Sequence, residues 1–176
     1  MVPLGFEPDP VVYLTERSAS LREHARELAF PGGRPEAGDL DLWATAAREA
    51  REEVGIESAR CLGELSTMPI FTSDYRLVPY VAAVCGAELR PTSSEVERVL
   101  AMRLMSVFDS TVIHAIPWEY AGSQLLSPVF EIRDRVLYGA TAHVLHELLR
   151  LLEPCFASPL PPLEAGKYSW EEVRVW

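Results

Sequence analysis

One stretch of the chain has the hydrophobic spacing of an amphipathic helix. Within residues 40–54, apolar side chains recur at four-residue intervals, which places them on one helix face: Leu42, Ala46 and Ala50. Either Asp39 or Asp41 can cap the first turn, and Gly55 follows where a helix is expected to end. The pattern therefore predicts a helix over 40–54 that buries a stripe of small and aliphatic side chains.

A second helix and several strands are predicted from the same kind of pattern. Residues 139–152 have helical spacing, with an apolar face made of Val144, Leu145, Leu148, Leu149 and Leu152. Runs of β-branched and aromatic residues predict strands over 11–14, 76–85, 96–104, 129–132 and 136–138. Because Pro79 lies inside the second run, we expect that strand at a sheet edge or with a bulge. Strands with two interspersed helices indicate a mixed α/β sandwich.

Proline and glycine divide the rest of the chain. The polar residues 16–29 are predicted to form a loop or a short irregular helix, which ends at Phe30-Pro31-Gly32-Gly33. Residues 153–176 are rich in proline and are predicted to be an extended tail packed on the domain. The length of 176 residues and the absence of an internal repeat predict one domain over 1–152, followed by this tail.

Composition and charge limit the class of protein. The net charge of −10 argues against general affinity for nucleic acid or anionic membranes, which attract clustered positive charge. No apolar run approaches the ~20 residues that cross a bilayer, and no secretory signal opens the sequence. Cys61, Cys85 and Cys155 are too widely spaced to form a framework, so we expect free, buried thiols in a reducing compartment. The expected location is the cytoplasm.

The segment with candidate chemistry lies at the end of the first predicted helix. Glu49, Glu52 and Glu53 fall on one helical arc of about 100°, beside the predicted buried stripe. Three neighbouring carboxylates repel one another, and a divalent cation such as Mg²⁺ or Mn²⁺ would relieve that repulsion. An acidic, solvated face that pairs with Arg48 and Arg51 is the alternative interpretation.

In its context this segment resembles the signature of the Nudix hydrolases. The family pattern is Gly, five residues, Glu, seven residues, and Arg-Glu-apolar-x-Glu-Glu-x-Gly-apolar. Here Gly33 begins the pattern, and residues 48–56, called the box below, end it as Arg-Glu-Ala-Arg-Glu-Glu-Val-Gly-Ile. Asp39 replaces the first Glu and the following gap is one residue longer, so Asp39 is a better helix cap than metal ligand.

An upstream motif is similar to the extra signature of the coenzyme A diphosphatase branch. That signature is Leu-Leu-Thr-x-Arg-Ser/Ala, three residues, Arg, three residues, Gly, three residues, and Phe-Pro-Gly-Gly. Residues 13–18, Arg22 and residues 30–33 match all of its spacings. Two positions depart from it, because Tyr13 replaces the first Leu and Arg26 replaces the Gly.

The resemblance implies a Nudix-type α/β/α sandwich with a mixed central sheet. It also implies metal-dependent hydrolysis of a nucleoside diphosphate linkage, in which Glu49, Glu52, Glu53 and the Gly33 carbonyl bind Mg²⁺ or Mn²⁺ and Arg48 orients a box glutamate. The favoured substrate is coenzyme A, split into 4′-phosphopantetheine and adenosine 3′,5′-bisphosphate. ADP-ribose, NADH or a nucleoside polyphosphate is the alternative. The expected partner is thus a small nucleotide, and the resemblance also allows a homodimer.

The roles of the remaining candidate residues have alternatives. Glu52 can serve as general base, as can a later glutamate, for which Glu95 is preferred to Glu97. Four arginines upstream of the box are candidates for phosphate recognition, including the 3′-phosphate of coenzyme A, or are ordinary surface arginines: Arg17, Arg22, Arg26 and Arg34. Four aromatic residues can stack on adenine or line a pantetheine groove, or belong to the core or an interface: Phe71, Tyr75, Trp118 and Tyr120.

Two further classes of protein are weighed against the enzyme. One is a Nudix-fold module that binds a nucleotide without catalysis. Such a module would be expected to lose box carboxylates, whereas all three are present here. The other is a plain structural domain, which does not account for carboxylates at the edge of a buried stripe.

Overall fold

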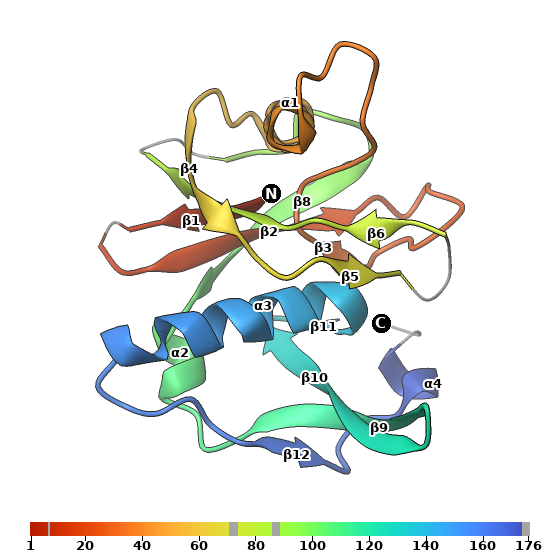
Figure 1. The fold of residues 1–176 in the computed structure, drawn as a ribbon, viewed down its shortest axis with the longest axis vertical. Coiled ribbons are helices and arrows are strands. Elements are labelled where there is room, and N and C mark those ends of the chain that lie inside the picture. Colours follow the sequence, from red (N-terminus) through yellow and green to blue (C-terminus); the bar gives the residue numbers. More distant parts are fainter. Residues whose placement is uncertain (7, 71–73, 86–88, 174–176) are drawn as a thin grey trace. The chain divides into compact units, whose positions relative to one another are not determined.

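The computed structural model describes residues 1–6, 8–70, 74–85 and 89–173 (Figure 1). The chain divides into two compact units, residues 1–103 and residues 104–176. Strands and helices alternate, and each unit contains a sheet with both parallel and antiparallel pairs. The predicted mixed α/β class with a mixed sheet is therefore confirmed.

The first unit is built on a six-stranded sheet with the order β3-β2-β1-β7-β4, in which β8 also pairs with β2. Its strands are β1 (Val2–Gly5), β2 (Val11–Arg17), β3 (Leu28–Ala29), β4 (Ala59–Glu64), β7 (Tyr80–Val84) and β8 (Val96–Arg103). The pair β1 and β7 is parallel, and the other pairs are antiparallel. Two short strands, β5 (Met68–Pro69) and β6 (Arg76–Leu77), form a separate antiparallel pair.

Helix α1 (Leu42–Val54) lies over this sheet (Figure 1). Of the two possible caps, Asp41 caps the helix by accepting a hydrogen bond from the Ala44 N–H, and Gly55 ends it at φ 72°. The apolar face of α1 packs against β7 through Ala46, Ala50 and Val54. The prediction that Leu42 is buried is wrong, because its neighbour Trp43 packs against the core and leaves Leu42 43% exposed.

Most of the predicted strands are present, with changed limits. The strand predicted over 11–14 continues to Arg17, and residues 16–29 contain parts of β2 and β3 rather than a helix. The run 76–85 is divided into β6 and β7 at Pro79, where the proline lacks the N–H that a continuous ladder needs. The sequence patterns did not predict β1 or β4. The aromatic candidate Phe71 lies outside the described residues.

The second unit is built on the four-stranded order β11-β10-β9-β12. Its elements are α2 (Met105–Phe108), β9 (Ile113–Tyr120), β10 (Ser123–Ile132), β11 (Arg135–Leu137), α3 (Gly139–Leu152), the 3₁₀ turn η1 (Glu153–Cys155), β12 (Leu163–Ala165) and α4 (Trp170–Val173). The strands predicted over 129–132 and 136–138 lie in the antiparallel pair of β10 and β11, and α3 has the predicted limits. The aromatic candidates Trp118 and Tyr120 lie in β9.

The proline-rich C-terminal segment contributes to the second unit. Strand β12 pairs in parallel with β9, and Val173 of α4 is 1% exposed in a core cluster with Ile116, Val129 and Val136. The segment therefore contains regular elements as well as extended chain. The limits of a domain over 1–152 with a tail over 153–176 stay a prediction.

Two sequence-based expectations about the surface have different outcomes. Cys61, Cys85 and Cys155 are free, but all three are exposed, so the expectation of buried thiols is wrong. Cys61 illustrates the reason, since it lies in β4, whose residues 60–64 are all exposed. Within the described ranges, no helix has the length and apolar character needed to cross a membrane.

Candidate functional site

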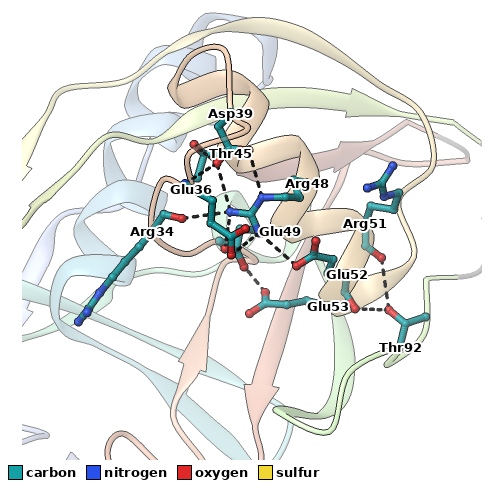
Figure 2. Close-up of polar contacts among 11 residues, drawn as sticks. Arg34, Glu36, Asp39, Thr45, Arg48, Glu49, Arg51, Glu52, Glu53 and Thr92 are labelled. Atoms are coloured by element: carbon teal, nitrogen blue, oxygen red, sulfur yellow. Dashed lines mark hydrogen bonds and ion pairs between the residues drawn. The ribbon is translucent and has the colours of Figure 1, made fainter.

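Arg48 is the centre of the polar cluster at the buried edge of α1 (Figure 2). Its Nη1 lies 3.1 Å from Glu52 Oε2, and its Nη2 lies 3.0 Å from Glu49 Oε1. Nη2 also donates to the Arg34 carbonyl at 3.0 Å. One guanidinium, 16% exposed, thus holds two of the three box glutamates and the loop that follows Gly33. That Arg48 orients a box glutamate for catalysis stays a prediction.

Asp39 holds Arg48 from the opposite side. Arg48 Nε lies 3.1 Å from Asp39 Oδ1, and the Thr45 hydroxyl donates to Oδ2 at 2.8 Å. The Glu36 N–H donates to the same carboxylate at 2.9 Å. Hydrogen bonds from Arg48 and from the Glu36 backbone hold the pKa of Asp39 at about 2. Asp39 is therefore not the cap of α1. Its own carboxylate is fully engaged in hydrogen bonds, and it fixes Arg48.

Glu49 lies directly against the backbone of Gly33. A Cβ at Gly33 would lie 2.5 Å from the Glu49 carboxyl carbon and 2.7 Å from Oε2. Any side chain at this position would displace the carboxylate or the loop. The glycine that begins the signature therefore leaves room for the close approach of a box carboxylate, and its own backbone is not left-handed.

Glu53 is the box carboxylate with a raised pKa. It is half-buried, and its Oε2 accepts a hydrogen bond of 3.1 Å from the Gly32 N–H. Burial, with smaller contributions from the charges of Glu49 and Glu95, raises the pKa of Glu53 to about 7. The Gly32 N–H and the charge of Arg17 oppose this rise without cancelling it. The protein surroundings of Glu53 therefore do not fully compensate the negative charge of its ionised form.

The end of β2 brings two more predicted residues to Glu53. Ser18 N–H donates to the Glu95 carbonyl at 2.7 Å, which fixes the loop before β8 beside Arg17. Arg17 and Glu95 both act electrostatically on Glu53. The Arg17 Nε is buried and has no hydrogen-bond partner among the described residues. A buried donor without a partner, close to a carboxylate cluster, is the kind of group that an anionic ligand satisfies.

The other predicted arginines are not gathered at the carboxylates. Arg22 and Arg26 are exposed in the loop between β2 and β3, and the Arg26 N–H donates to the Arg17 carbonyl at 3.0 Å. Arg26 has φ 65°, in the left-handed region that favours glycine. The Arg34 guanidinium lies away from the box glutamates (Figure 2) and its Cζ is 4.3 Å from the centre of the Tyr75 ring.

Thr92 is a residue of the site that the sequence did not predict. Its N–H donates to the Glu53 carbonyl at 3.0 Å, and its hydroxyl donates to the Glu52 carbonyl at 2.7 Å. Thr92 thereby joins the end of α1 to the loop that carries Glu95 (Figure 2). Because the contact joins residues 40 positions apart, no local pattern indicates it. Thr45 was missed for a similar reason, since a buried helical threonine has no distinctive signal.

The residues of the site fit a divalent cation by their chemistry. Among the described residues no three His, Cys, Asp or Glu side chains are already arranged as a metal site. Arg48 contacts two of the box carboxylates, Glu49 and Glu52. However, three carboxylates come from one helix, one has a raised pKa, and a glycine keeps the space beside them free of side chains. Hard cations such as Mg²⁺ bind such oxygens. Glu49, Glu52, Glu53 and the Gly33 carbonyl are the groups that could hold one.

Comparisons with known proteins identify the family of the chain. The NUDIX domain model matches residues 4–119. The chain is 31% identical to the uncharacterized Nudix hydrolase NudL of Photorhabdus laumondii over 87% of this chain and 83% of the relative. It is 32% identical to NudL of Pectobacterium atrosepticum over 84% and 78%.

A solved structure resembles the fold as well. The crystal structure of a NUDIX hydrolase from Nitrosomonas europaea aligns with a TM-score of 0.55 and 13% identity, over 94% of this chain and 79% of that chain. This likeness concerns the fold alone. Because the family model spans more than half of the residues and relatives above 30% identity align over most of their length, the chain belongs to the Nudix hydrolase family.

Proposed function

We propose that this protein hydrolyses a nucleoside-linked diphosphate with the help of Mg²⁺ or Mn²⁺. The observation that carries the proposal is the set of box carboxylates on one helix, with Glu49 packed directly against Gly33. Membership of a family of hydrolases supports it. In this proposal Glu49, Glu52, Glu53 and the Gly33 carbonyl are the metal ligands.

The surrounding residues would divide the work of the reaction. When bound, the metal supplies positive charge that offsets the diphosphate and the charge that develops on the leaving phosphate. Arg17 would donate to a phosphate oxygen through its buried Nε. Arg48 would keep Glu49 and Glu52 in place, because it contacts both. Water then adds to phosphorus, the phosphorus–oxygen bond to the leaving phosphate breaks, and two phosphate monoesters form.

The general base in this scheme is Glu52 or Glu95. Glu52 is 52% exposed, so a water molecule can reach its side chain, which lies 3.1 Å from Arg48. Glu95 is exposed and acts on Glu53 from the loop before β8. Single substitutions of Glu52 and Glu95 by Gln would identify the base. The rate of hydrolysis is measured as a function of pH for each variant, and the base is the residue whose loss removes the limb of the pH–rate profile that rises with pH.

We propose coenzyme A as the substrate, with 4′-phosphopantetheine and adenosine 3′,5′-bisphosphate as products. The support is the upstream motif at residues 13–18, Arg22 and residues 30–33. Arg22, Arg26 and Arg34 are the candidates for the 3′-phosphate, since a guanidinium binds a phosphate through two N–H groups. The departures at Tyr13 and Arg26 favour ADP-ribose, NADH or a nucleoside polyphosphate as the second candidate.

A substrate panel tests the proposal. The wild-type protein and Glu52→Gln are incubated with coenzyme A, dephospho-coenzyme A, ADP-ribose, NADH and a nucleoside triphosphate, in excess Mg²⁺ and then Mn²⁺. Mass spectrometry identifies the products. We expect 4′-phosphopantetheine, released fastest from coenzyme A, and little turnover by the variant. Faster cleavage of ADP-ribose or NADH would reject coenzyme A as the substrate and would still support metal-dependent hydrolysis of a diphosphate. No turnover of any compound would reject the enzymatic proposal.

A further inference from the structure

The side chains of Arg34 and Tyr75 form an exposed cation–π contact in the first unit. The guanidinium carbon of Arg34 lies 4.3 Å from the centre of the Tyr75 ring, which is the distance of a stacked contact. Arg34 is exposed, and Tyr75 is 51% exposed. A contact between two exposed side chains contributes little to folding, so stability alone is a weak reason for it.

The pair is joined to the box glutamates through the backbone of Arg34. The Arg34 carbonyl accepts a hydrogen bond of 3.0 Å from Arg48, whose guanidinium also contacts Glu49 and Glu52. Arg34 directly follows Gly33, whose backbone lies against the Glu49 carboxylate. The main chain of Arg34 is therefore part of the carboxylate cluster, whereas its side chain leads away from it toward Tyr75 (Figure 2).

This separation suits the two ends of a nucleotide. A diphosphate needs the charged groups near Glu49 and Glu53, and a base needs a flat surface at some distance from them. Bases stack on aromatic rings and on the planes of arginine guanidinium groups alike. A guanidinium that is already stacked on a ring is held in one plane, and its N–H edge can still meet a phosphate.

We propose that Arg34 and Tyr75 form a stacking platform for the nucleobase of the substrate, beside the diphosphate site. The proposal rests on the proposed function, since it assumes that the diphosphate of a nucleotide binds at the box glutamates. It decides between two interpretations of Tyr75, a core or interface residue and a base-stacking residue, in favour of stacking.

Two substitutions of Tyr75 separate the ring from its hydroxyl. Tyr75→Leu keeps apolar volume but removes the aromatic face, and Tyr75→Phe keeps that face. Arg34→Lys keeps the charge and removes the planar group. Calorimetric titration in Mg²⁺ measures the Kd of two probes for each protein: ADP, which has a base, and inorganic pyrophosphate, which has none.

We expect Tyr75→Leu to raise the Kd of ADP about tenfold. Removal of an aromatic side chain that stacks on a base commonly weakens binding by this order of magnitude. The Kd of pyrophosphate should stay within about twofold, and Tyr75→Phe should bind both probes like the wild type. Arg34→Lys should weaken ADP more than pyrophosphate.

Several results would overturn the stacking platform. One is an unchanged Kd of ADP in Tyr75→Leu, and another is an equal loss for both probes, which would make Tyr75 a residue that shapes the diphosphate site. A wild-type protein that binds pyrophosphate as tightly as ADP would reject the platform alone. A wild-type protein that binds neither probe in Mg²⁺ would reject the proposed function together with the platform.

Discussion

Two glutamates, one in each unit of the molecule, have opposite electrostatic surroundings. Glu53 in the first unit is half-buried beside the charges of Glu49 and Glu95, and its pKa is raised to about 7. Glu131 in the second unit accepts hydrogen bonds from Lys167 and, at 2.8 Å, from the Tyr168 hydroxyl. These two hydrogen bonds, that from Lys167 foremost, lower the pKa of Glu131.

We interpret Glu131 as a carboxylate that serves the fold, whereas Glu53 is the carboxylate that we propose binds a ligand. Glu131 links β10 to the C-terminal segment, and its charge is balanced within the protein. Glu53 has one backbone N–H and the charge of Arg17 in its favour, against two like charges and partial burial. A perturbed carboxylate without a counter-charge is common at functional sites, because a ligand supplies the missing charge. The second unit shows that this chain can neutralise a glutamate where function does not require otherwise.

The largest expected effect comes from breaking this contrast by substitution. Glu53→Gln should lower kcat on the cleaved substrate by about a thousandfold in saturating Mg²⁺, because a proposed metal ligand is lost. Glu131→Gln, which removes the same charge from the second unit, should leave kcat within about twofold. Steady-state kinetics of both purified variants make the comparison. A wild-type rate for Glu53→Gln would show that Glu53 is not a ligand.

A glycine pair tests the same site through geometry rather than charge. Gly33→Ala places a Cβ against the Glu49 carboxylate, so kcat/KM should fall about thirtyfold, with a higher Mg²⁺ concentration needed for half-maximal rate. Gly38→Ala is the matched control, since a Cβ there has no atom of the described residues within 4 Å. If both variants retained wild-type kcat/KM and Mg²⁺ dependence, the contact between Gly33 and Glu49 would have no role in catalysis.

In the metal-free protein, Glu53→Gln and Glu131→Gln should change the free energy of unfolding in opposite directions. The pKa of Glu53 is raised from 4.5 to about 7. As pH rises, Glu53 therefore loses its proton at a lower pH in the unfolded state than in the folded state. This destabilises the fold progressively as pH rises from about 4.5 through 7, and it has no effect below 4.5. Glu53→Gln should therefore increase the free energy of unfolding by about 2 kcal/mol at pH 8.

For Glu131 the sign reverses. Its lowered pKa contributes stability at neutral pH that is lost as pH falls through the folded-state pKa. Because its side chain is 48% exposed, solvent screens the interaction, and Glu131→Gln should cost at most ~1 kcal/mol at pH 8. Urea unfolding of both variants in EDTA at pH 8 and pH 5 measures the effects. A shift of the same sign for both variants at pH 8 would show that the contrast between the units is absent in solution.

How far the sequence predicts this molecule differs along the chain. Helices α1 and α3 were predicted nearly to the residue, because their apolar periodicity agrees with their end signals, such as Gly55. Strands β1 and β4 were missed. All four residues of β1 are buried, and β4 is almost entirely exposed, so neither has the alternation that marks a half-buried strand.

The candidate site shows the same limit. The carboxylates of one helix follow from spacing, and the structure places Arg17 and Glu95 beside them. Contacts between distant segments do not follow from spacing. Thr92 at the end of α1 and Tyr75 under Arg34 join segments that no local pattern relates. The structure also gives a reason for the glycine of the related signature, because Arg26, which replaces it, occupies a left-handed position.

The smallest expected effect concerns Arg26, which replaces the glycine of the related signature. Its substitution tests whether this residue serves the fold or a ligand. Arg26 has φ 65°, which costs a non-glycine residue about 1–2 kcal/mol. Arg26→Gly removes this strain but increases the entropy of the unfolded chain, so the net gain in the free energy of unfolding should be about 0.5 kcal/mol. Arg22→Gly, in the same loop without a positive φ, should give no gain. Urea unfolding compares the two variants.

Activity assays on the same proteins decide what the strain at Arg26 is for. If Arg26 contacts the 3′-phosphate of coenzyme A, Arg26→Gly should be more stable yet have a KM for coenzyme A several times higher, with the KM for dephospho-coenzyme A unchanged. A gain in stability with both KM values unchanged would make Arg26 a neutral departure from the signature. A loss of stability would show that the arginine side chain contributes more to the loop than its backbone strain costs.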